Sequence, residues 1–481
     1  MKIHDVVIIG GGIIGTSIAR EMSRYRIKIA LMEKEEELAF GVSKSNSGII
    51  HPGTQNDPSS LKGKLCVRGN AMVREISKEL GIDLKEVGEL IIAFSEEEKT
   101  RLLALKKDAD ILGVPGTSIV DNVWLKKNEP NLNEAAVAAL YAPTAGIISP
   151  YRYVYDLAEN AACNGVEINV DTEVLDIVRN SKKRDKYRFE IVTSKGTFRA
   201  NYIINAAGLF ADEIASMVGI EDIKISPRKG EEFILDKKKE HLTEHLLFPL
   251  PSKKSKGILV TRTSDGNPMI GPTAVDIDDK YDISTSDEGF EEVIRSAQRL
   301  MPSINEGDII SYFAGLRPAC GDDFIIRYED DLPGFINVAG IQSPGLTAAP
   351  AVAEMVLNIL KTKGFRPMRK LFFHKHRKRT IHLFDVTFKE TKRLIEKDSE
   401  YGDIVCRCEM VSAKEIRDAI KRGASTMDGI KFRTRAQAGR CHGSFCTCRL
   451  LEILKEETKK SATDITKRGP GSEIVKGVKG E

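Results

Sequence analysis

The sequence predicts an α/β fold, in which a Rossmann-type nucleotide-binding domain is interleaved with an α+β domain and followed by a small helical domain. Three observations favour this architecture. A strand pattern near the N-terminus runs into a glycine-rich turn, helix and strand patterns alternate through most of the chain, and five of the eight cysteines lie close together after residue 400. Alternating strands and helices are typical of a largely parallel sheet covered by helices.

The composition is that of a globular protein large enough for two or three domains. The 481 residues are 41% hydrophobic and 30% charged, which excludes a disordered or fibrous chain. The net charge of +3 is too small to indicate nucleic-acid binding, so no nucleic-acid partner is expected. No run of about 18 apolar residues predicts a membrane span. The N-terminus enters a strand pattern without a signal-peptide cleavage site, so a cytoplasmic location is expected.

The first 33 residues predict one βαβ unit. Residues 4–9 form an apolar run of strand length, residues 13–19 have helical spacing, and residues 27–32 form a second strand closed by Glu33. The turn at residues 10–15 fits the G-x-G-x-x-G fingerprint in the context that the fingerprint requires.

This fingerprint has a specific physical basis. Gly10 permits a tight turn, Gly12 lets the backbone approach a pyrophosphate, and Gly15 lets the helix pack close to the sheet. The helix N-terminus offers free N–H groups to the phosphates, and Glu33 is expected to accept hydrogen bonds from the adenosine ribose. FAD and NAD both place a pyrophosphate at such a turn, so the fingerprint alone leaves the cofactor open.

The rest of the chain continues the alternation. Further strands are expected at 166–170, 187–192, 197–204, 257–261 and 335–339, and helices at 155–165 and 346–360.

Two later segments favour FAD over NAD. Residues 203–212 form a strand followed by an Ala-Gly turn, and residues 338–347 form a strand, a Gly/Pro loop and a helix start. A helix N-terminus aimed at the flavin pyrimidine edge would stabilise the negative charge that builds up on reduction. A nicotinamide enzyme has no need of this further approach of the chain.

Together these segments resemble the D-amino-acid-oxidase superfamily of FAD oxidoreductases over residues 1 to about 360, and within it the branch of glycerol-3-phosphate and L-2-hydroxyglutarate dehydrogenases. The resemblance implies a Rossmann-type FAD-binding domain interleaved with an α+β substrate domain. The matching segments are residues 10–15, 45–51, 205–212, 265–267, 271–272, 314–318 and 343–347. The FAD-binding residues that the resemblance implies are Gly10, Gly12, Ile14, Gly15, Glu33, Ser45, Asn46, Ser47, Val174, Ala207, Gly208, Gly340, Gly345, Leu346 and Thr347.

The resemblance also implies catalytic residues. His51 ends a loop of small residues that lies against the flavin in this branch, and it is expected to take the hydroxyl proton of an alcohol or to bind the substrate. Arg317 resembles the arginine that holds the anionic group of the substrate, and Ser343 is expected to donate its hydroxyl to the same group. Lys256 is either a second cation of this site or part of an ordinary charged turn over residues 253–256.

The clustered cysteines indicate a metal or redox site, because a disulfide framework is rare in a long chain without a secretion signal. Cys406 and Cys408, with Cys441 and Cys446, resemble the ligands of the bacterioferritin-associated-ferredoxin-like [2Fe–2S] domain. Four thiolates supply two ligands to each iron. A four-cysteine zinc site is the alternative. Cys448 is a fifth thiol, either spare or a substitute ligand.

The domain boundaries follow from these segments. The oxidoreductase domain spans 1–365, the [2Fe–2S]-binding domain spans 401–455, and a polar tail that is expected to be poorly ordered spans 456–481. The linker, 366–400, begins with a strongly basic stretch at 366–379 that is either a solvated connection or a membrane or partner surface. Within the first domain, the FAD-binding parts are about 1–85, 145–220 and 330–365, and the substrate parts are about 86–144 and 221–329.

The combined architecture resembles the catalytic subunits of anaerobic FAD-dependent glycerol-3-phosphate dehydrogenases. It implies a small anionic substrate, glycerol 3-phosphate or a 2-hydroxy acid such as L-2-hydroxyglutarate, and an electron-acceptor protein or quinone-linked subunit as partner. Peripheral association with the inner face of a membrane through that partner stays open. A third alternative is an electron-transfer subunit whose flavin is reduced by another protein.

Overall fold

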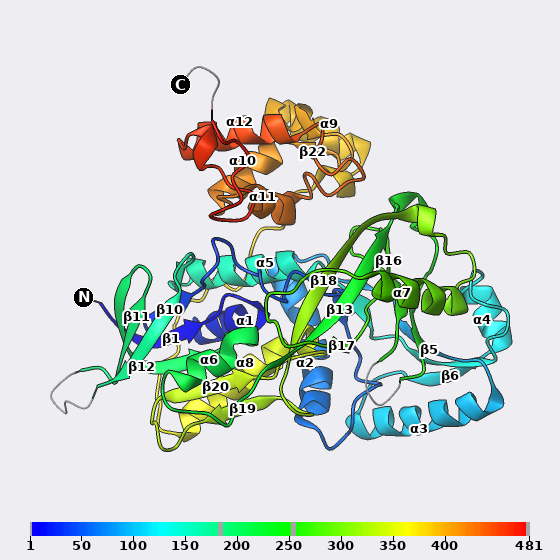
Figure 1. Cartoon of the computed structure of the whole chain (residues 1–481), viewed down its shortest axis with the longest axis horizontal. Coiled ribbons are helices and arrows are strands. Elements are labelled where there is room, and N and C mark those ends of the chain that lie inside the picture. Colours follow the sequence, from blue (N-terminus) through cyan, green and yellow to red (C-terminus); the bar gives the residue numbers. More distant parts are fainter. Residues whose placement is uncertain (1, 181–185, 252–255, 478–481) are drawn as a thin grey trace.

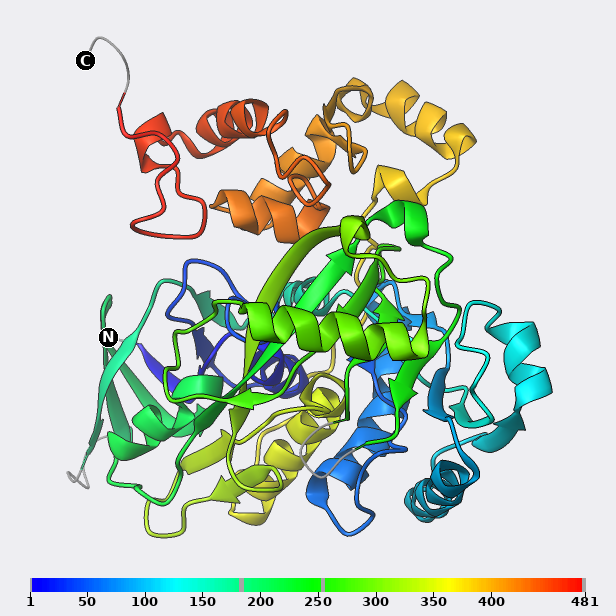
Figure 2. The same cartoon turned by 45° about the vertical axis from the view of Figure 1, so that its right-hand side comes forward.

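The computed structural model describes residues 2–180, 186–251 and 256–477. Figures 1 and 2 show a large body that contains the first 365 residues and a smaller helical lobe, drawn in orange and red, that lies above it. Three of the four residues in the charged turn expected at 253–256 lie outside the described residues, and Lys256 alone is described.

The first sheet of the large body is centred on β1 (Ile3–Ile9). Strands β2 (Ile29–Met32) and β12 (Gly196–Asn205) pair with β1 in parallel on its two sides, and α1 (Ile13–Met22) connects β1 to β2. The predicted βαβ unit is therefore present. The remaining strands of this sheet are β9 (Glu167–Asn169), β10 (Val174–Arg179), β11 (Phe189–Thr193), β19 (Ile325–Tyr328) and β20 (Phe335–Ala339).

The apolar run of β1 is explained by burial on both faces of the sheet. Val6 and Ile8 belong to one hydrophobic cluster, and Val7 and Ile9 belong to another on the opposite face. A strand in the middle of a parallel sheet lacks a solvated face, so its sequence is a continuous run of apolar residues. The helices packed on the first of these faces are α1, α2 (Leu61–Leu80), α5 (Pro150–Cys163) and α8 (Gly345–Thr362).

The second sheet of the large body is mostly antiparallel. Its longest strands, β13 (Ser226–Leu235) and β18 (Ile309–Ala319), pair along almost their full length. The other strands are β5 (Glu89–Ala93), β6 (Ser118–Asp121), β7 (Ala138–Ala142), β14 (Leu246–Pro249), β15 (Leu259–Arg262), β16 (Pro268–Gly271) and β17 (Val275–Asp276).

Helices border this sheet, and short elements join the two parts of the body. The bordering helices are α3 (Glu96–Leu112), α4 (Asn122–Asn128) and α7 (Asp287–Leu300), while α6 (Ala211–Ser216) follows β12. A three-stranded sheet of β3 (Ile49–Ile50), β4 (Lys85–Glu86) and β8 (Gly146–Ile147) lies where the chain passes between the two parts. The predicted α/β class with an interleaved second domain is confirmed.

The small lobe has a hydrophobic core of its own, formed by side chains such as Ile416, Ile430 and Leu450. Its helices are α10 (Ala413–Lys421), α11 (Met427–Thr434) and α12 (Thr447–Thr458), with a hairpin of β21 (Ile404–Cys406) and β22 (Val411–Ser412). In the capping box of α10, the side chains of Ser412 and Glu415 satisfy free backbone N–H groups.

The segment between the lobes is more ordered than a solvated linker. The backbone N–H of His374 donates to the Asn164 side chain at 2.9 Å, and Arg377 lies between Asp156 and Glu159 on α5. Helix α9 (Phe388–Lys397) then forms before the small lobe begins. The expected linker is therefore held on the surface of the large body by ion pairs. A charge-rich composition does not show whether the charged side chains face solvent or form such pairs.

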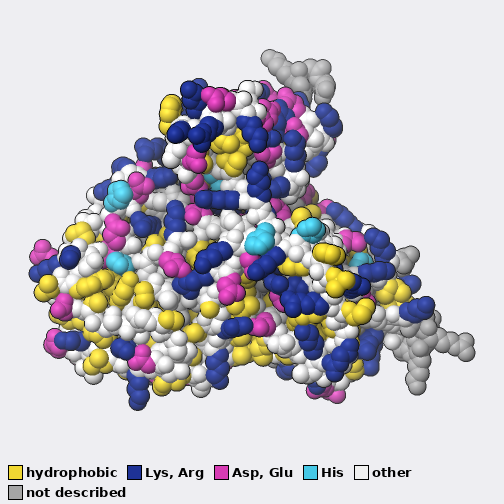
Figure 3. Space-filling view, turned by 180° about the vertical axis from the view of Figure 1, so that it is seen from behind, with side chains coloured by type: hydrophobic (Ala, Val, Ile, Leu, Met, Phe, Trp, Pro, Cys, Tyr) yellow, Lys and Arg dark blue, Asp and Glu magenta, His cyan; other side chains and the backbone are white. Residues whose placement is uncertain are grey.

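The expected polar tail also makes contacts. Ile465 is fully buried in the core of the small lobe, although its neighbours in the sequence are polar. None of the helices in the three described ranges has the length and apolar content that a membrane crossing requires. In the view from behind, basic and acidic side chains are interspersed over both lobes (Figure 3).

Candidate active site and metal centre

A cavity of about 230 Å³ lies at the carboxyl ends of β1 and β2, where the glycine fingerprint predicts a dinucleotide. Gly10 has φ +111°, and a Cβ on it would lie 2.3 Å from the Ala206 carbonyl oxygen. A Cβ on Gly15 would lie 1.9 Å from the Gly10 carbonyl oxygen. Both positions therefore exclude any side chain, which matches the roles of tight turn and close helix packing.

Glu33 closes β2 at the edge of this cavity. Its carboxylate accepts hydrogen bonds from the backbone N–H groups of Gly11 at 2.8 Å and Glu35 at 3.0 Å. Burial raises the pKa of Glu33. The predicted residues that line this cavity are Gly10, Gly12, Ile14, Glu33, Val174, Ala207, Gly208 and Gly340. Gly15 is buried behind them and does not line the cavity.

A second cavity, of about 380 Å³, continues from the first. The two share Ile13, Val42, Ser43, Pro318 and Ile341 as lining residues, so they form one elongated space. The second cavity is lined by the predicted flavin-side residues Ser45, Asn46, Ser47, Gly345 and Leu346. An extended cavity with a glycine turn at one end and the N-terminus of α8 at the other fits FAD.

All four predicted catalytic residues, His51, Lys256, Arg317 and Ser343, line this second cavity. They come from segments that are far apart in the chain. Thr347 does not line the cavity; its Oγ1 accepts the backbone N–H of His51 at 2.9 Å and so holds the histidine loop against α8.

The His51 ring lies between two polar groups. Its Nε2 is 3.4 Å from the Ser343 hydroxyl oxygen, and its Nδ1 is 3.9 Å from a Glu89 carboxylate oxygen. Burial, and secondarily the nearby Lys256 ammonium, lower the pKa of His51 to about 4. The imidazole is therefore neutral near pH 7 and is able to accept a proton.

The Arg317 side chain is held by the backbone of a neighbouring segment. The Arg317 guanidinium donates to the Thr273 carbonyl oxygen at 3.2 and 3.3 Å. It crosses Gly230 on the paired strand, where a Cβ would lie 2.5 Å from an Arg317 nitrogen. Burial lowers the pKa of both Arg317 and Lys256, which marks two desolvated cations that an anion would stabilise.

The sequence analysis missed four charged residues that line this cavity, Lys62, Arg228, Glu232 and Asp322. Arg228 and Glu232 lie on β13, and with Gly230 between them every second residue of the strand faces the cavity. Glu89, which begins β5, was also missed; it lies 3.9 Å from His51 Nδ1 but does not line the cavity. The period-two spacing of β13 was the one signal available, and it is common to every half-buried strand.

The predicted metal ligands form two pairs of thiols. The sulfur atoms of Cys408 and Cys441 are 3.4 Å apart, and a hydrogen bond with Cys446 lowers the pKa of Cys406. Among the described residues no three His, Cys, Asp or Glu side chains converge as ligands of a single ion do. Two thiol pairs fit the two thiolates that each iron of a [2Fe–2S] cluster needs. Cys448 is exposed on α12.

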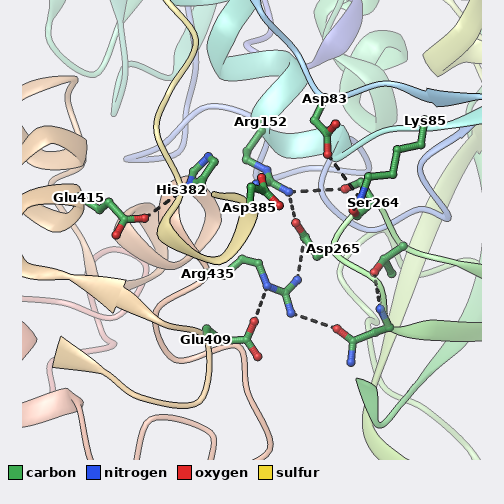
Figure 4. A network of polar contacts seen from close by, with 12 residues as sticks. Asp83, Lys85, Arg152, Ser264, Asp265, His382, Asp385, Glu409, Glu415 and Arg435 are labelled. Atoms are coloured by element: carbon green, nitrogen blue, oxygen red, sulfur yellow. Dashed lines mark hydrogen bonds and ion pairs between the residues drawn. The ribbon is translucent and has the colours of Figure 1, made fainter. Parts of the chain in front are cut away.

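The small lobe is anchored to the second sheet of the large body by buried ion pairs (Figure 4). Arg435 pairs with Asp265 at 2.7 Å and with Glu409, the residue after Cys408, at 2.6 Å. Arg152, from α5, also pairs with Asp265. Although burial alone would raise it, the pKa of Asp265 is held well below its usual range by Arg152 and Arg435.

A second anchor joins the small lobe to the nucleotide-binding part. Arg433 pairs with the buried Glu37 at 2.7 Å, and its guanidinium lies 3.8 Å from the centre of the Tyr155 ring. The backbone N–H of Ser425 donates to the same carboxylate at 3.0 Å. These contacts are the reason that the cluster-binding loops lie over the body rather than at the end of a free tether.

Comparisons with known proteins agree with this geometry. The family model of FAD dependent oxidoreductases matches residues 5–359, and that of the BFD-like [2Fe-2S] binding domain matches residues 404–456. The chain is 42% identical over 476 residues to a glycerol 3-phosphate dehydrogenase of Caloramator mitchellensis, covering 98% of each protein. It is 32% identical over 318 residues to the mitochondrial L-2-hydroxyglutarate dehydrogenase of Bos taurus, covering 64% of this chain and 67% of that protein.

A solved structure gives the same result. The dithionite-reduced L-α-glycerophosphate oxidase of Mycoplasma pneumoniae, with FAD bound, has a TM-score of 0.74 at 30% identity, covering 78% of this chain and 98% of that chain. The predicted oxidoreductase superfamily, the FAD cofactor and the [2Fe–2S] module are thereby confirmed.

Proposed function

We propose that this chain, which belongs to the FAD-dependent oxidoreductase family and carries a BFD-like [2Fe-2S] binding domain, oxidises sn-glycerol 3-phosphate to dihydroxyacetone phosphate. The observation that carries the proposal is the second cavity, in which a neutral histidine lies with two partly buried cations. The relative that is 42% identical over almost the whole chain bears the same activity in its name.

In this proposal the two cations bind the phosphate. A guanidinium matches two phosphate oxygens bidentately, so Arg317 orients the substrate, while Lys256 adds a point charge. The phosphate in turn offsets the desolvation that lowers the pKa of both side chains.

His51 is the proposed base for the hydroxyl proton of the reacting carbinol. Its backbone N–H is held by Thr347, and the Ser343 hydroxyl lies beside Nε2, so the ring presents this nitrogen to the cavity. Bound FAD supplies the acceptor for the electron pair of the carbinol C–H bond. The low pKa of His51 keeps the base unprotonated at the start of each turnover.

The cluster is the proposed exit for electrons. Cys406, Cys408, Cys441 and Cys446 would hold it, and a one-electron carrier next to a two-electron site allows the pair to leave singly. The proposed acceptor is a further protein or a quinone-linked subunit. Electron paramagnetic resonance of the substrate-reduced protein tests this route: a reduced-cluster signal supports it, and silence in a protein that contains iron contradicts it.

Anaerobic mixing of the purified protein with glycerol 3-phosphate, while the flavin absorbance is followed, tests the substrate. The expected result is rapid loss of the oxidised flavin spectrum with glycerol 3-phosphate and little change with L-2-hydroxyglutarate. The reverse preference would assign the chain to 2-hydroxy-acid oxidation. A flavin that neither compound reduces, and that a partner protein does reduce, would make it an electron-transfer subunit.

A further inference from the structure

Glu232 is a buried carboxyl group of the second cavity for which the proposed chemistry has no use. The residue is 3% exposed and lines the cavity from β13. One carboxyl oxygen, Oε1, accepts the Ser47 hydroxyl at 2.8 Å. The other oxygen, Oε2, is buried without a hydrogen-bond partner among the described residues.

A buried carboxyl oxygen without a hydrogen-bond partner indicates a position where a ligand binds. A buried polar atom without a hydrogen-bond partner keeps the full cost of its desolvation, so natural proteins rarely contain one without a role. Burial raises the pKa of Glu232 to about 7, while Ser47 and the Arg317 charge oppose that rise. Arg317 is the cation that faces Glu232, but the two side chains form no ion pair in the described chain, so the carboxyl group stays available to a molecule in the cavity.

The strand geometry places this oxygen on the same cavity wall as the phosphate-binding arginine. Residue 230 of β13 pairs with residue 315 of β18, and Arg317 extends across Gly230 toward the cavity. Glu232 is the next residue of β13 that faces the same side. A ligand whose phosphate is bound by Arg317 therefore extends along a wall that also carries a carboxyl group.

We propose that Glu232 selects the substrate at the carbon next to the reacting carbinol, where Oε2 binds the terminal hydroxymethyl group of glycerol 3-phosphate and excludes a carboxylate. This inference rests on the proposed function and makes it more specific. Glycerol 3-phosphate and L-2-hydroxyglutarate differ at that carbon: the first carries a hydroxymethyl group and the second a carboxylate. A hydroxyl group satisfies the free oxygen in either protonation state of Glu232, whereas a carboxylate brings another charge to a desolvated site and is repelled by the ionised form.

The test is a cycle of two deletions, one in the substrate and one in the protein. Values of kcat/KM are measured anaerobically, with a one-electron acceptor dye, for glycerol 3-phosphate, for 2-hydroxypropyl phosphate, which lacks only the terminal hydroxyl, and for L-2-hydroxyglutarate. The proteins are the wild type, Glu232→Ala, Glu232→Gln and the matched control Glu231→Gln. Glu231 is also a buried carboxylate of β13, but its partner is Ser286 rather than the cavity.

The wild type is expected to prefer glycerol 3-phosphate over 2-hydroxypropyl phosphate by about 10- to 100-fold, the range for a hydrogen bond to a charged or buried group. In Glu232→Ala this preference disappears, because the variant lacks the carboxyl group that binds the terminal hydroxyl group. Glu232→Gln keeps most of the preference, since an amide also bonds a hydroxyl, but gains activity with L-2-hydroxyglutarate. Glu231→Gln keeps the wild-type selectivity.

Each contrary result has a distinct meaning. An unchanged preference in Glu232→Ala, in a wild type that oxidises glycerol 3-phosphate, overturns the inference and leaves the proposed function intact. A changed flavin spectrum or FAD content with unchanged selectivity also overturns it, because Glu232 would then serve the flavin through Ser47. A wild type that glycerol 3-phosphate does not reduce contradicts the proposed function itself. If Glu232→Ala does not fold, the gain of Glu232→Gln with L-2-hydroxyglutarate decides the question.

Discussion

The flavin and substrate cavity and the cluster-binding lobe are built in opposite ways. The residues of the cavity come from positions between Ile9 and Leu346, and they meet because two sheets and several loops bring them together. The four predicted ligand cysteines lie between Cys406 and Cys446, in two short segments of a lobe with its own core. The cavity forms only when the whole large body folds, whereas the metal centre needs only residues 404–456.

This difference predicts which substitutions affect substrate chemistry and which affect electron exit. None of the described residues that line the two cavities comes from the cluster lobe, so a substitution of a cysteine in that lobe removes no side chain from the cavities. The two regions are joined by Arg435 with Asp265 and by Arg433 with Glu37. The comparison therefore predicts that substrate chemistry, electron exit and docking are separable by single substitutions.

The largest effect is expected from His51→Ala. Loss of a positioned base should lower the rate of flavin reduction by about 100- to 10,000-fold, with FAD and iron content unchanged. Stopped-flow absorbance with glycerol 3-phosphate under anaerobic conditions measures this rate. A decrease of only a few-fold would mean that His51 positions the substrate and that another group takes the proton.

The next effect is expected from Cys441→Ser, which removes one of the four predicted cluster ligands. Nearly all turnover with a one-electron acceptor should be lost, while a single flavin reduction by substrate proceeds at the wild-type rate, because the cavity has no residue from the cluster lobe. Steady-state assays and single-turnover stopped flow, on the same sample, separate the two. Loss of both activities would show that the metal centre also supports the cavity.

A smaller effect is expected from Arg435→Gln, which removes the cation shared by Asp265 and Glu409. Truncating one member of a buried charge pair costs about 2–5 kcal/mol, and the cost should lie near the lower end because Arg152 still neutralises Asp265. Limited proteolysis of the segment before the small lobe should become faster.

Arg417→Gln is the matched control for the docking variant. Arg417 is also an arginine of the small lobe, but its partners Glu400, Glu456 and Glu457 all belong to the C-terminal part of the chain. This variant should lower the thermal stability of the lobe without exposing the connection to protease. Equal proteolysis of both variants would argue that lobe stability, rather than docking, controls access.

The smallest effect is expected from Cys448→Ser. The thiol is exposed at the start of α12, so its replacement should change stability by no more than about 0.5 kcal/mol and leave the iron content and the cluster signal intact. Iron analysis and electron paramagnetic resonance measure this. Loss of iron would identify Cys448 as a ligand and one of the four predicted cysteines as the spare thiol.

Most of the fold was predictable because its signals are local. The βαβ unit appears in the spacing of apolar residues and glycines, and the structure places Gly10 and Gly15 where no side chain fits. The cysteine set was visible because its members lie in two short segments, but the expectation that each pair comes from one loop was wrong: the thiols pair across the segments, Cys406 with Cys446 and Cys408 with Cys441. Helix α9 and the buried Ile465 were not predicted, since charge-rich segments look alike whether they are solvated or packed on a surface.

The sequence by itself determined the dinucleotide turn and the clustering of the cysteines, because both depend on residue types at short spacings, whereas His51 as the base was predicted from the family resemblance. Only the tertiary structure decided that Lys256 faces the same cavity as Arg317, that Glu232 has an unpartnered oxygen there, and that Arg435 joins the small lobe to Asp265. Such contacts depend on strand register and domain docking. Strand register and domain docking produce no periodic pattern in the sequence, because the contacting residues are many positions apart. Their burial depends on the side chains that pack around them.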